Sequence, residues 1–449
     1  MKHQLRLYQR EAFRFLKRNG SSGFFVEMRM GKTLVMIRLL RRMRRPILVV
    51  APGSAIGSWI DDLVDEEQPY TTLLGSRAQR LKTLAAGLAF GRGWFLINKE
   101  GHRALPELAN VSWGAVILDE SHFIKNPKAK VTKFYTKNFR DVPYRYVLTG
   151  TPNPESRLDM VTQFIFTHGH CCGFTNYWSF EHAMTTSFDG YTKNLKKTAR
   201  EAMVSFVSRN AFVLNRASAG MDVEKVVRTR YIELPTKVRK AYNKLEKEFI
   251  LELGEVYESH IWRMSQYAAL RSLCSGVLPS QEEGGGWLWD GKVRELLDLL
   301  EGELAGQQVV VWFSFIQPMR LVAANLAKAK VSCTFIDGSV PMVERFERIR
   351  KFNAGGARVI LVQERVGESG IKLAAADTAV YFTEPPGLVT KQQSEDRILL
   401  VEKQSILLIP FVVPDTVEHD IHKALGMKRR EALTFLNEAM RRRALRGSK

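Results

Sequence analysis

The sequence predicts an α/β protein built from two parallel-sheet domains with a helical segment between them. Short apolar runs alternate with helical stretches over residues 1–165, which is the pattern of a parallel sheet covered by helices. Longer amphipathic stretches replace this alternation over residues 166–290, and the alternation returns over residues 291–449. A chain of 449 residues is also long enough for two such domains.

The first domain is expected to hold a sheet of buried strands. Each expected strand is apolar at consecutive positions, as strands covered on both faces are. These strands are residues 23–26, 47–51, 94–97, 115–118 and 146–148.

Residues 166–290 are expected to form helical protrusions and a linker. The clearest helix is residues 237–255, where apolar side chains recur at intervals of three or four and form one stripe. The glycine-rich residues 281–289 interrupt this pattern and indicate a linker or an exposed turn.

The last third of the chain returns to the α/β pattern of the first. The expected strands are residues 309–313, 333–336, 359–362 and 379–382, and the expected helices are residues 294–304 and 342–352. The alternation predicts a second parallel sheet.

The chain is strongly basic. It has 67 Lys and Arg residues against 47 Asp and Glu residues, a net charge of +20, and much of the excess is clustered at residues 38–45 and 441–449. Such an excess favours a polyanionic partner such as nucleic acid. An ordinary basic protein remains the alternative, and the clusters do not locate a binding surface.

Composition also bears on the cellular setting. No segment approaches the ~18 uninterrupted apolar residues of a membrane span, so no membrane partner is expected. The four cysteines are too few and too scattered for a disulfide framework, which favours a reducing compartment.

A motif after the first expected strand has the features of a phosphate-binding loop. Residues 23–33 read GFFVEMRMGKT, a buried strand and a turn that ends in Gly31, Lys32 and Thr33 before an apolar helix. Backbone N–H groups at the start of such a helix bind phosphate oxygens. Lys32 would reach the β- and γ-phosphates, and the Thr33 hydroxyl would bind magnesium.

Adjacent carboxylates follow a later strand of the same expected sheet. Residues 115–122 read AVILDESH, an apolar strand that ends in Asp119 and Glu120. Asp119 can hold magnesium through water, and Glu120 can orient and deprotonate the attacking water. A coincidental acidic turn is the alternative, but the GKT tripeptide in the same α/β domain favours a site that hydrolyses ATP.

These motifs, together with others along nearly the whole chain, resemble the SWI/SNF-type ATPases of helicase superfamily two, as found in a compact bacterial or phage member. The first-half matches are LRLYQREAF with Gln9, EMRMGKT, PILVVAPGSAIGSWIDDL with Trp59, LDESHFIKNPKAK, and LTGTP at residues 148–152. Arg29 stands where the family usually has glycine.

The second half matches the same family in order and spacing. The matching segments are VVVWFSF at residues 309–315, IDGSV with Gly338 and the later Arg345, GESGIKL at residues 367–373, QSEDR at residues 393–397, and DTVEHDI at residues 415–421. The last of these resembles the family's C-terminal brace.

The resemblance implies two RecA-like lobes that hold one ATP between them. Residues 1–165 would be the first lobe, residues 166–290 the helical protrusions and linker, and residues 291–449 the second lobe with the brace and a basic tail. ATP and magnesium are the implied cofactors.

The resemblance also implies a role for individual residues. ATP binding is expected at Gln9, Arg29, Met30, Gly31, Lys32, Thr33, Leu34, Gly370 and Arg397. Hydrolysis is expected to depend on Lys32, Asp119, Glu120 and Arg397, and magnesium on Thr33 and Asp119. Coupling of ATP to movement on nucleic acid is expected at Thr149, Gly150, Thr151 and Gln393.

One position departs from the family in a way that bears on activity. The sixth motif usually has a second arginine three residues after Arg397, and this sequence has Leu400 there. An arginine that completes such a site contributes roughly 10³–10⁵ in rate in related phosphoryl-transfer systems. Either Arg397 suffices, another cation substitutes, or hydrolysis is weak.

The expected function is a DNA-dependent ATPase that translocates on double-stranded DNA and remodels protein–DNA or branched DNA structures. The alternatives are a strand-separating helicase and a catalytically weak ATP-dependent clamp on DNA or protein. The reason for considering the clamp is Leu400, which stands in place of the second arginine. A monomer in the cytoplasm of a bacterium or a phage-infected cell is expected.

Overall fold

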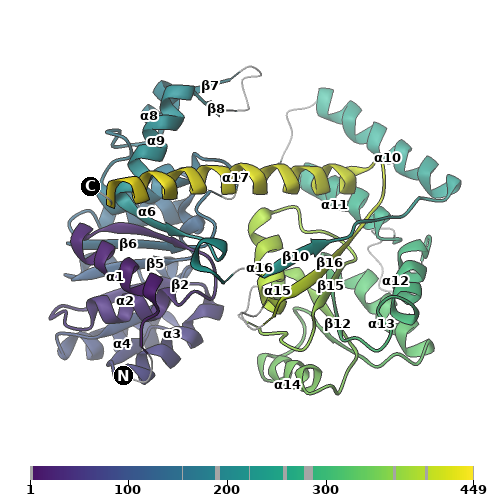
Figure 1. Cartoon of the computed structure of the whole chain (residues 1–449), viewed down its shortest axis with the longest axis horizontal. Helices are drawn as coiled ribbons and strands as arrows, with labels where there is room; N and C mark the ends of the chain where they lie inside the picture. The colour runs from purple at the N-terminus through teal and green to yellow at the C-terminus, as the bar shows by residue number, and fades with distance from the viewer. Residues whose placement is uncertain are drawn as a thin grey trace. The chain divides into compact units, whose positions relative to one another are not determined.

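The computed structural model describes residues 4–153, 155–187, 193–221, 223–255, 260–277, 287–367, 371–399 and 403–447. The chain divides into two compact units, one of Met1–Asp222 with Lys428–Lys449 and the other of Val223–Met427. Each unit contains a parallel sheet with helices packed against it (Figure 1). The predicted α/β class with two parallel-sheet domains is confirmed.

The sheet of the first unit has the strand order β3-β4-β2-β5-β6-β1-β9, and every neighbouring pair is parallel. Its strands are β1 (Ser22–Val26), β2 (Ile47–Ala51), β3 (Tyr70–Thr72), β4 (Trp94–Asn98), β5 (Ala115–Asp119), β6 (Tyr144–Thr149) and β9 (Ala211–Leu214). Each of the five strands predicted for this domain is present, within two residues at each end.

Apolar cores lie on both faces of this sheet, because alternate side chains of each strand point to opposite faces. In β2, Leu48 and Val50 belong to one core, whereas Ile47, Val49 and Ala51 belong to the other. The helices of this unit are α1 (Leu7–Asn19), α2 (Lys32–Leu40), α3 (Gly53–Asp65), α4 (Arg77–Ala89), α5 (Gly101–Ala104), α6 (Lys130–Asn138), α7 (Asp159–His168), α8 (Tyr177–Met184), α9 (Lys197–Asn210) and the last part of α17 (Val417–Gly447).

The sheet of the second unit has the order β10-β16-β15-β12-β14-β13, and β11 also pairs with β16. All of these pairs are parallel. The strands are β10 (Glu224–Val227), β11 (Arg230–Tyr231), β12 (Val309–Phe313), β13 (Cys333–Ile336), β14 (Val359–Gln363), β15 (Thr378–Tyr381) and β16 (Ser405–Val412).

The helices of the second unit include each one predicted from the sequence. They are α10 (Thr236–Glu255), α11 (His260–Cys274), α12 (Gly291–Glu301), α13 (Ile316–Lys328), α14 (Met342–Asn353), α15 (Glu364–Gly367), α16 (Leu388–Ile398) and the first part of α17 (Val417–Gly447). Residues of α17 from Lys428 onward belong to the first unit.

The two units differ from the expected boundaries at residues 165 and 290. Strand β9 lies in the expected helical segment, yet it pairs with β1 and completes the first sheet. Strands β10 and β11 lie in the same segment and join the second sheet, and β7 (Thr185–Thr186) pairs with β8 (Asn194–Leu195) as a small antiparallel hairpin. Of the expected linker, residues 281–286 lie outside the described residues.

No helix in the described part of the chain is both long enough and apolar enough to cross a lipid bilayer.

Candidate nucleotide-binding site

The sequence motifs of the first unit meet because their strands are neighbours. Strands β5, β6 and β1 are consecutive in the sheet and parallel, so their carboxyl ends lie at one edge, where ligands bind in such sheets. The phosphate-loop motif follows β1, the acidic pair ends β5, and the LTGTP motif ends β6. The structure therefore brings together most of the predicted residues of this unit.

The phosphate loop contains two left-handed backbone positions. Arg29 has φ +62° and Gly31 has φ +71°, and Gly31 directly precedes helix α2. A Cβ atom on Gly31 would lie 2.4 Å from Nε2 of Gln9, so this position needs glycine both for its φ angle and for space. Arg29, by contrast, takes up a positive φ with a side chain, which is uncommon for a residue other than glycine.

The loop is held from the side of helix α1. The Gln9 side chain is buried, and its Nε2 donates to the Met30 carbonyl at 3.3 Å. The Tyr8 hydroxyl donates to the same carbonyl at 3.2 Å. Gln9 therefore contacts the loop itself in this structure, in addition to the ATP-binding role that the resemblance implies.

The residues that are expected to hold phosphates lie at the start of helix α2. Lys32, Thr33 and Leu34 form its first turn, where backbone N–H groups have no partner inside the helix. The Lys32 ammonium donates to the Val26 carbonyl at 2.8 Å and to the Glu27 carbonyl at 3.3 Å. The Lys32 ammonium is therefore held by carbonyl groups at the end of β1 and the start of the loop.

Asp119 is a buried carboxylate with fixed hydrogen bonds. Its Oδ2 accepts a hydrogen bond from Nε1 of Trp59 at 2.9 Å, and its Oδ1 accepts one from the Glu120 backbone N–H at 3.0 Å. Burial, followed by the charge of Glu120, raises the pKa of Asp119 to about 6, against the opposing charge of Lys32. Such a carboxylate favours a cation nearby.

Glu120 occupies a left-handed backbone conformation, with φ +49°. Its Oε2 accepts a hydrogen bond from the Thr149 hydroxyl at 3.3 Å and lies 3.5 Å from Nδ1 of His122. Burial and two lysines lower the pKa of His122 to about 3, so this imidazole is neutral near pH 7. The side chain of Glu120 is thus held by the end of β6.

Sequence reasoning did not assign a role to His122. Its available signal was its position two residues after Glu120 in the DESH sequence. The structure adds that His122 also lies 3.4 Å from the Thr149 hydroxyl through Nδ1.

The LTGTP motif packs directly on the phosphate loop. A Cβ atom on Gly150 would lie 3.3 Å from the Met28 nitrogen and 3.4 Å from the Glu27 Cα. The Thr151 backbone N–H donates to the Thr149 hydroxyl at 3.0 Å, which fixes the turn. A movement of the phosphate loop would therefore displace the LTGTP segment as well.

The remaining predicted residues belong to the second unit. Gln393 and Arg397 lie on helix α16, where Arg397 is buried and its carbonyl accepts a hydrogen bond from the Leu373 backbone N–H at 2.9 Å. Gly370 and Leu400 lie outside the described residues.

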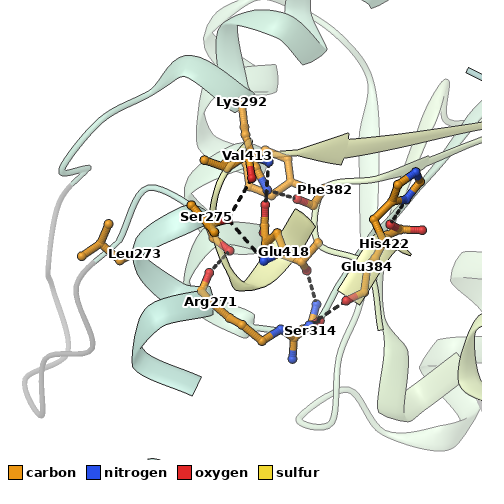
Figure 2. A network of polar contacts seen from close by, with 12 residues as sticks. Arg271, Leu273, Ser275, Lys292, Ser314, Phe382, Glu384, Val413, Glu418 and His422 are labelled. Carbon is orange, nitrogen blue, oxygen red and sulfur yellow. Dashed lines mark hydrogen bonds and ion pairs between the residues drawn. The ribbon is translucent and has the colours of Figure 1, made fainter. Parts of the chain in front are cut away.

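A polar network at the carboxyl ends of the second sheet includes Glu384 and His422 (Figure 2), and helix α16 is joined to it through Lys391. Glu384, which follows β15, accepts from the Lys391 ammonium at 2.7 Å and from Nδ1 of His422 at 2.6 Å. These partners hold the pKa of Glu384 down, at about 2, despite its burial. Glu384 thereby joins the helix that carries Arg397 to the start of α17.

The network extends through two further buried groups, as Figure 2 shows. One guanidinium nitrogen of Arg271 donates to the Ser314 hydroxyl and to the Glu384 carbonyl, both at 2.7 Å. The Lys292 ammonium donates to the Phe382 carbonyl and to both oxygens of Glu418, each at 2.8 Å. Nothing in the sequence motifs pointed to this network, because its members are distant in the sequence.

A parallel sheet with a phosphate loop, a strand-end acidic pair and a second α/β unit defines the class of helicase-like nucleotide hydrolases. The SNF2-related domain family matches residues 8–275, and the helicase conserved C-terminal domain matches residues 291–399. The first match covers more than half of the chain. The chain belongs to the SNF2-related family, an ATPase family of helicase superfamily two, and the resemblance inferred from its motifs is confirmed.

Several characterised proteins are similar to this chain. The transcription regulatory protein SNF2 of Saccharomyces cerevisiae is 26% identical over 447 residues, which cover 88% of this chain and 25% of that protein. The putative ATP-dependent helicase/translocase YwqA of Bacillus subtilis is 22% identical, over 95% of this chain and 48% of its own length. The human DNA excision repair protein ERCC-6 is 22% identical, over 84% and 27% respectively. The chain therefore spans half or less of each of these relatives.

Among solved structures, the chain matches one described as the Sulfolobus solfataricus SWI2/SNF2 ATPase core in complex with dsDNA. The two chains are 18% identical, the match covers 98% of this chain and 95% of the other, and the TM-score is 0.46.

Proposed function

We propose that this protein is a DNA-dependent ATPase that translocates on double-stranded DNA and remodels protein–DNA or branched DNA structures. The observation that supports this most directly is the meeting of Lys32, Asp119 and Glu120 at one edge of the first sheet, in a chain of the SNF2-related family. These residue types at this place bind ATP and activate water for its hydrolysis.

The residues present fit a bound magnesium ion. A threonine hydroxyl at Thr33 and a carboxylate at Asp119 are hard oxygen ligands of the kind magnesium takes. When bound, the ion would neutralise charge on the phosphates. Lys32 would bind the β- and γ-phosphates, and Trp59 would orient Asp119 through its 2.9 Å hydrogen bond.

Glu120 is the proposed general base. In its left-handed conformation its carboxylate is held by Thr149 at 3.3 Å, beside the neutral His122. It would take the proton of the attacking water as the bond to the γ-phosphate forms. Arg397 would act on the same ATP from the second domain, and Gln393, Thr149, Gly150 and Thr151 would couple ATP state to DNA movement.

Double-stranded DNA is the proposed substrate of the movement. Support comes from the net charge of +20, which favours a polyanion. Family membership adds to it, since relatives include a helicase/translocase and a DNA excision repair protein by name. We further propose that the protein acts as a monomer in the cytoplasm of a bacterium or a phage-infected cell, where ATP and DNA are both present.

The test of this function is ATP turnover with and without duplex DNA in two variants. Lys32→Ala should weaken ATP binding, because the charge that neutralises the phosphates is lost. Glu120→Gln should bind ATP like the parent but turn over at least about 100-fold more slowly, because water activation is lost. Parental turnover by Glu120→Gln would show that Glu120 is not the base.

The second candidate function is a clamp that binds ATP but hydrolyses it weakly, and Leu400 in place of the family's second arginine favours it. Arg397→Ala separates the two functions. It should abolish DNA-stimulated hydrolysis in a motor, whereas a clamp would keep its already low rate.

A strand-separating helicase is distinguished by its product. We expect the protein to displace the third strand of a DNA triplex without separating the strands of a duplex. Separation of the duplex in an ATP-dependent manner would identify a helicase.

A further inference from the structure

The phosphate loop of this chain has Arg29 where the family usually has glycine, and the structure shows what holds the loop. A loop that is not shaped by glycine needs external contacts to keep its N–H groups directed at a phosphate.

One of these contacts comes from Arg216, about 190 residues later in the sequence. Arg216 follows strand β9, which pairs in parallel with β1, so the two strand ends place Arg216 beside the loop. Its side chain is only 5% exposed, and one guanidinium nitrogen donates to the Met28 carbonyl at 2.7 Å.

Glu27 holds Arg216 in return. The Arg216 backbone N–H donates to Oε2 of Glu27 at 3.3 Å, and Nε of the guanidinium lies 3.9 Å from the same oxygen. The Glu27 backbone N–H in turn donates to the Leu214 carbonyl at 3.4 Å. Glu27 and Arg216 therefore form a reciprocal contact between the loop and the segment after β9.

The hydrogen bond to Met28 has a geometric consequence. The C=O and N–H groups of one trans peptide unit point in opposite directions. Because Arg216 fixes the Met28 carbonyl, it also fixes the direction of the Arg29 N–H. Gln9 and Tyr8 fix the Met30 carbonyl, and thus the Gly31 N–H, in the same way. The Met28–Arg29 peptide unit is therefore held by Arg216, and the Met30–Gly31 peptide unit by Gln9 and Tyr8.

We propose that Arg216 is a positioning residue for ATP binding: it acts through the Met28–Arg29 peptide unit and keeps the loop N–H groups directed at the phosphates. This inference rests on the proposed function, since it assumes that the loop binds ATP. Arg216 itself is not proposed to contact ATP.

The experiment measures the affinity for a fluorescent ATP analogue with magnesium, and then steady-state turnover with saturating duplex DNA. Arg216→Ala should raise both Kd and KM for ATP by about tenfold or more, because a charged hydrogen bond that orders the loop is lost. Its kcat should stay within about threefold of the parent, because Lys32, Asp119 and Glu120 are intact. Arg216→Lys should recover part of the affinity, since an ammonium can still donate to the Met28 carbonyl.

Arg145→Ala is the matched control. Arg145, on strand β6 of the same unit, also donates to backbone carbonyls, those of Phe139 and Thr167, but does not contact the loop. It should lower the melting temperature without changing ATP affinity in the folded protein.

Each outcome bears on a different claim. If the parent does not bind the ATP analogue, the proposed function fails before Arg216 is tested. If the parent binds and a folded Arg216→Ala protein binds equally well, the positioning role is wrong. Full recovery in Arg216→Lys, with a loss in Arg216→Ala that disappears at high salt, would mean that Arg216 supplies charge alone, which also overturns positioning.

Discussion

Asp119 and Glu364 are buried carboxyl groups beside the carboxyl ends of parallel strands, and burial is the main reason that the pKa of each is raised. Their neighbours differ. Asp119 lies near Lys32 in the proposed catalytic site, whereas Glu364 accepts a hydrogen bond from the Ser314 hydroxyl at 2.6 Å. The sequence identified Asp119 from its motif. It could not identify Glu364, because the residues that bury it come from distant segments.

Glu364 should make stability depend on pH. Its pKa is raised from 4.5 to about 7 by burial and by the charge of Glu384, against the hydrogen bond from Ser314 and the charges of Arg271 and Lys391. A raised pKa means that the folded state holds the proton more tightly, so the stabilisation is complete below pH 4.5 and is lost as the pH rises through 7. The loss is on the order of 3 kcal/mol.

Glu364→Gln should remove most of this dependence, since an amide oxygen can still accept from Ser314 and does not ionise. Urea unfolding at pH 5, 6, 7 and 8 would measure it. A variant with the same pH dependence as the parent would show that Glu364 does not cause it.

Trp59 offers a second test at the scale of one residue. It is fully buried, and its indole N–H donates to Asp119 at 2.9 Å. Trp59→Phe keeps most of the apolar contacts but removes the donor, so Asp119 should lose orientation and turnover should fall by about tenfold. Trp94→Phe, which changes the neighbouring buried indole at a ring distance of 6.1 Å, is the control and should leave turnover close to the parental rate. Equal losses in the two variants would indicate a packing effect instead.

At the scale of elements, the sequence predicted some strands with their bounds and missed others. Strands β2, β12 and β13 begin and end where they were expected, because long apolar runs between turn residues are a local signal. Strand β9 is a four-residue run directly after a helix, which periodicity cannot separate from that helix. Strand β16 contains Pro410, a residue that argues against a central strand, yet it pairs with β10 and β15.

Side-chain contacts between distant elements could not be predicted from local sequence patterns. Helix α12 is joined to α17 by the ion pair of Lys292 and Glu418, whose side chains are 1% and 6% exposed. These residues are separated by more than a hundred positions, and their pairing depends on the sheet that lies between them in the sequence. The same holds for Arg216 and the phosphate loop.

Removal of one partner of this buried pair should destabilise the second unit. Lys292→Met leaves the Glu418 carboxylate buried without its cation, and such a loss costs roughly 3–5 kcal/mol. The double variant Lys292→Met/Glu418→Gln should regain part of this, because the amide oxygen can still accept from the Val413 N–H without a charge. Urea unfolding followed by tryptophan fluorescence would measure both. A double variant less stable than the single one would contradict the explanation.

At the scale of the whole molecule, the charge of +20 is a property of the sequence that needs no structure to interpret. It predicts a partner class, and family membership agrees with that prediction. It does not locate the DNA path, because the basic residues are spread along the chain and each unit's arrangement decides which of them share a face.

Affinity for duplex DNA should therefore fall steeply with salt. Each phosphate contact releases counterions, so log Kd should rise against log salt concentration with a slope of about 0.9 per contact. Sequence should matter little, because phosphate contacts carry no base information. Fluorescence anisotropy at several salt concentrations with two unrelated duplexes would test this. Binding that ignores salt, or that strongly prefers one duplex, would contradict a motor that tracks along DNA.

The late position of β9 in the sequence has a consequence for the synthesis of the protein. Strand β1 has a neighbour on only one side until residues 211–214 have been made, and an open strand edge of this kind can pair with other chains. A polypeptide interrupted before that point would carry the GKT motif and both carboxylates, yet it would lack the strand and the arginine that stand beside the phosphate loop. Such an interrupted chain should therefore bind ATP more weakly than a chain that includes residues 211–216.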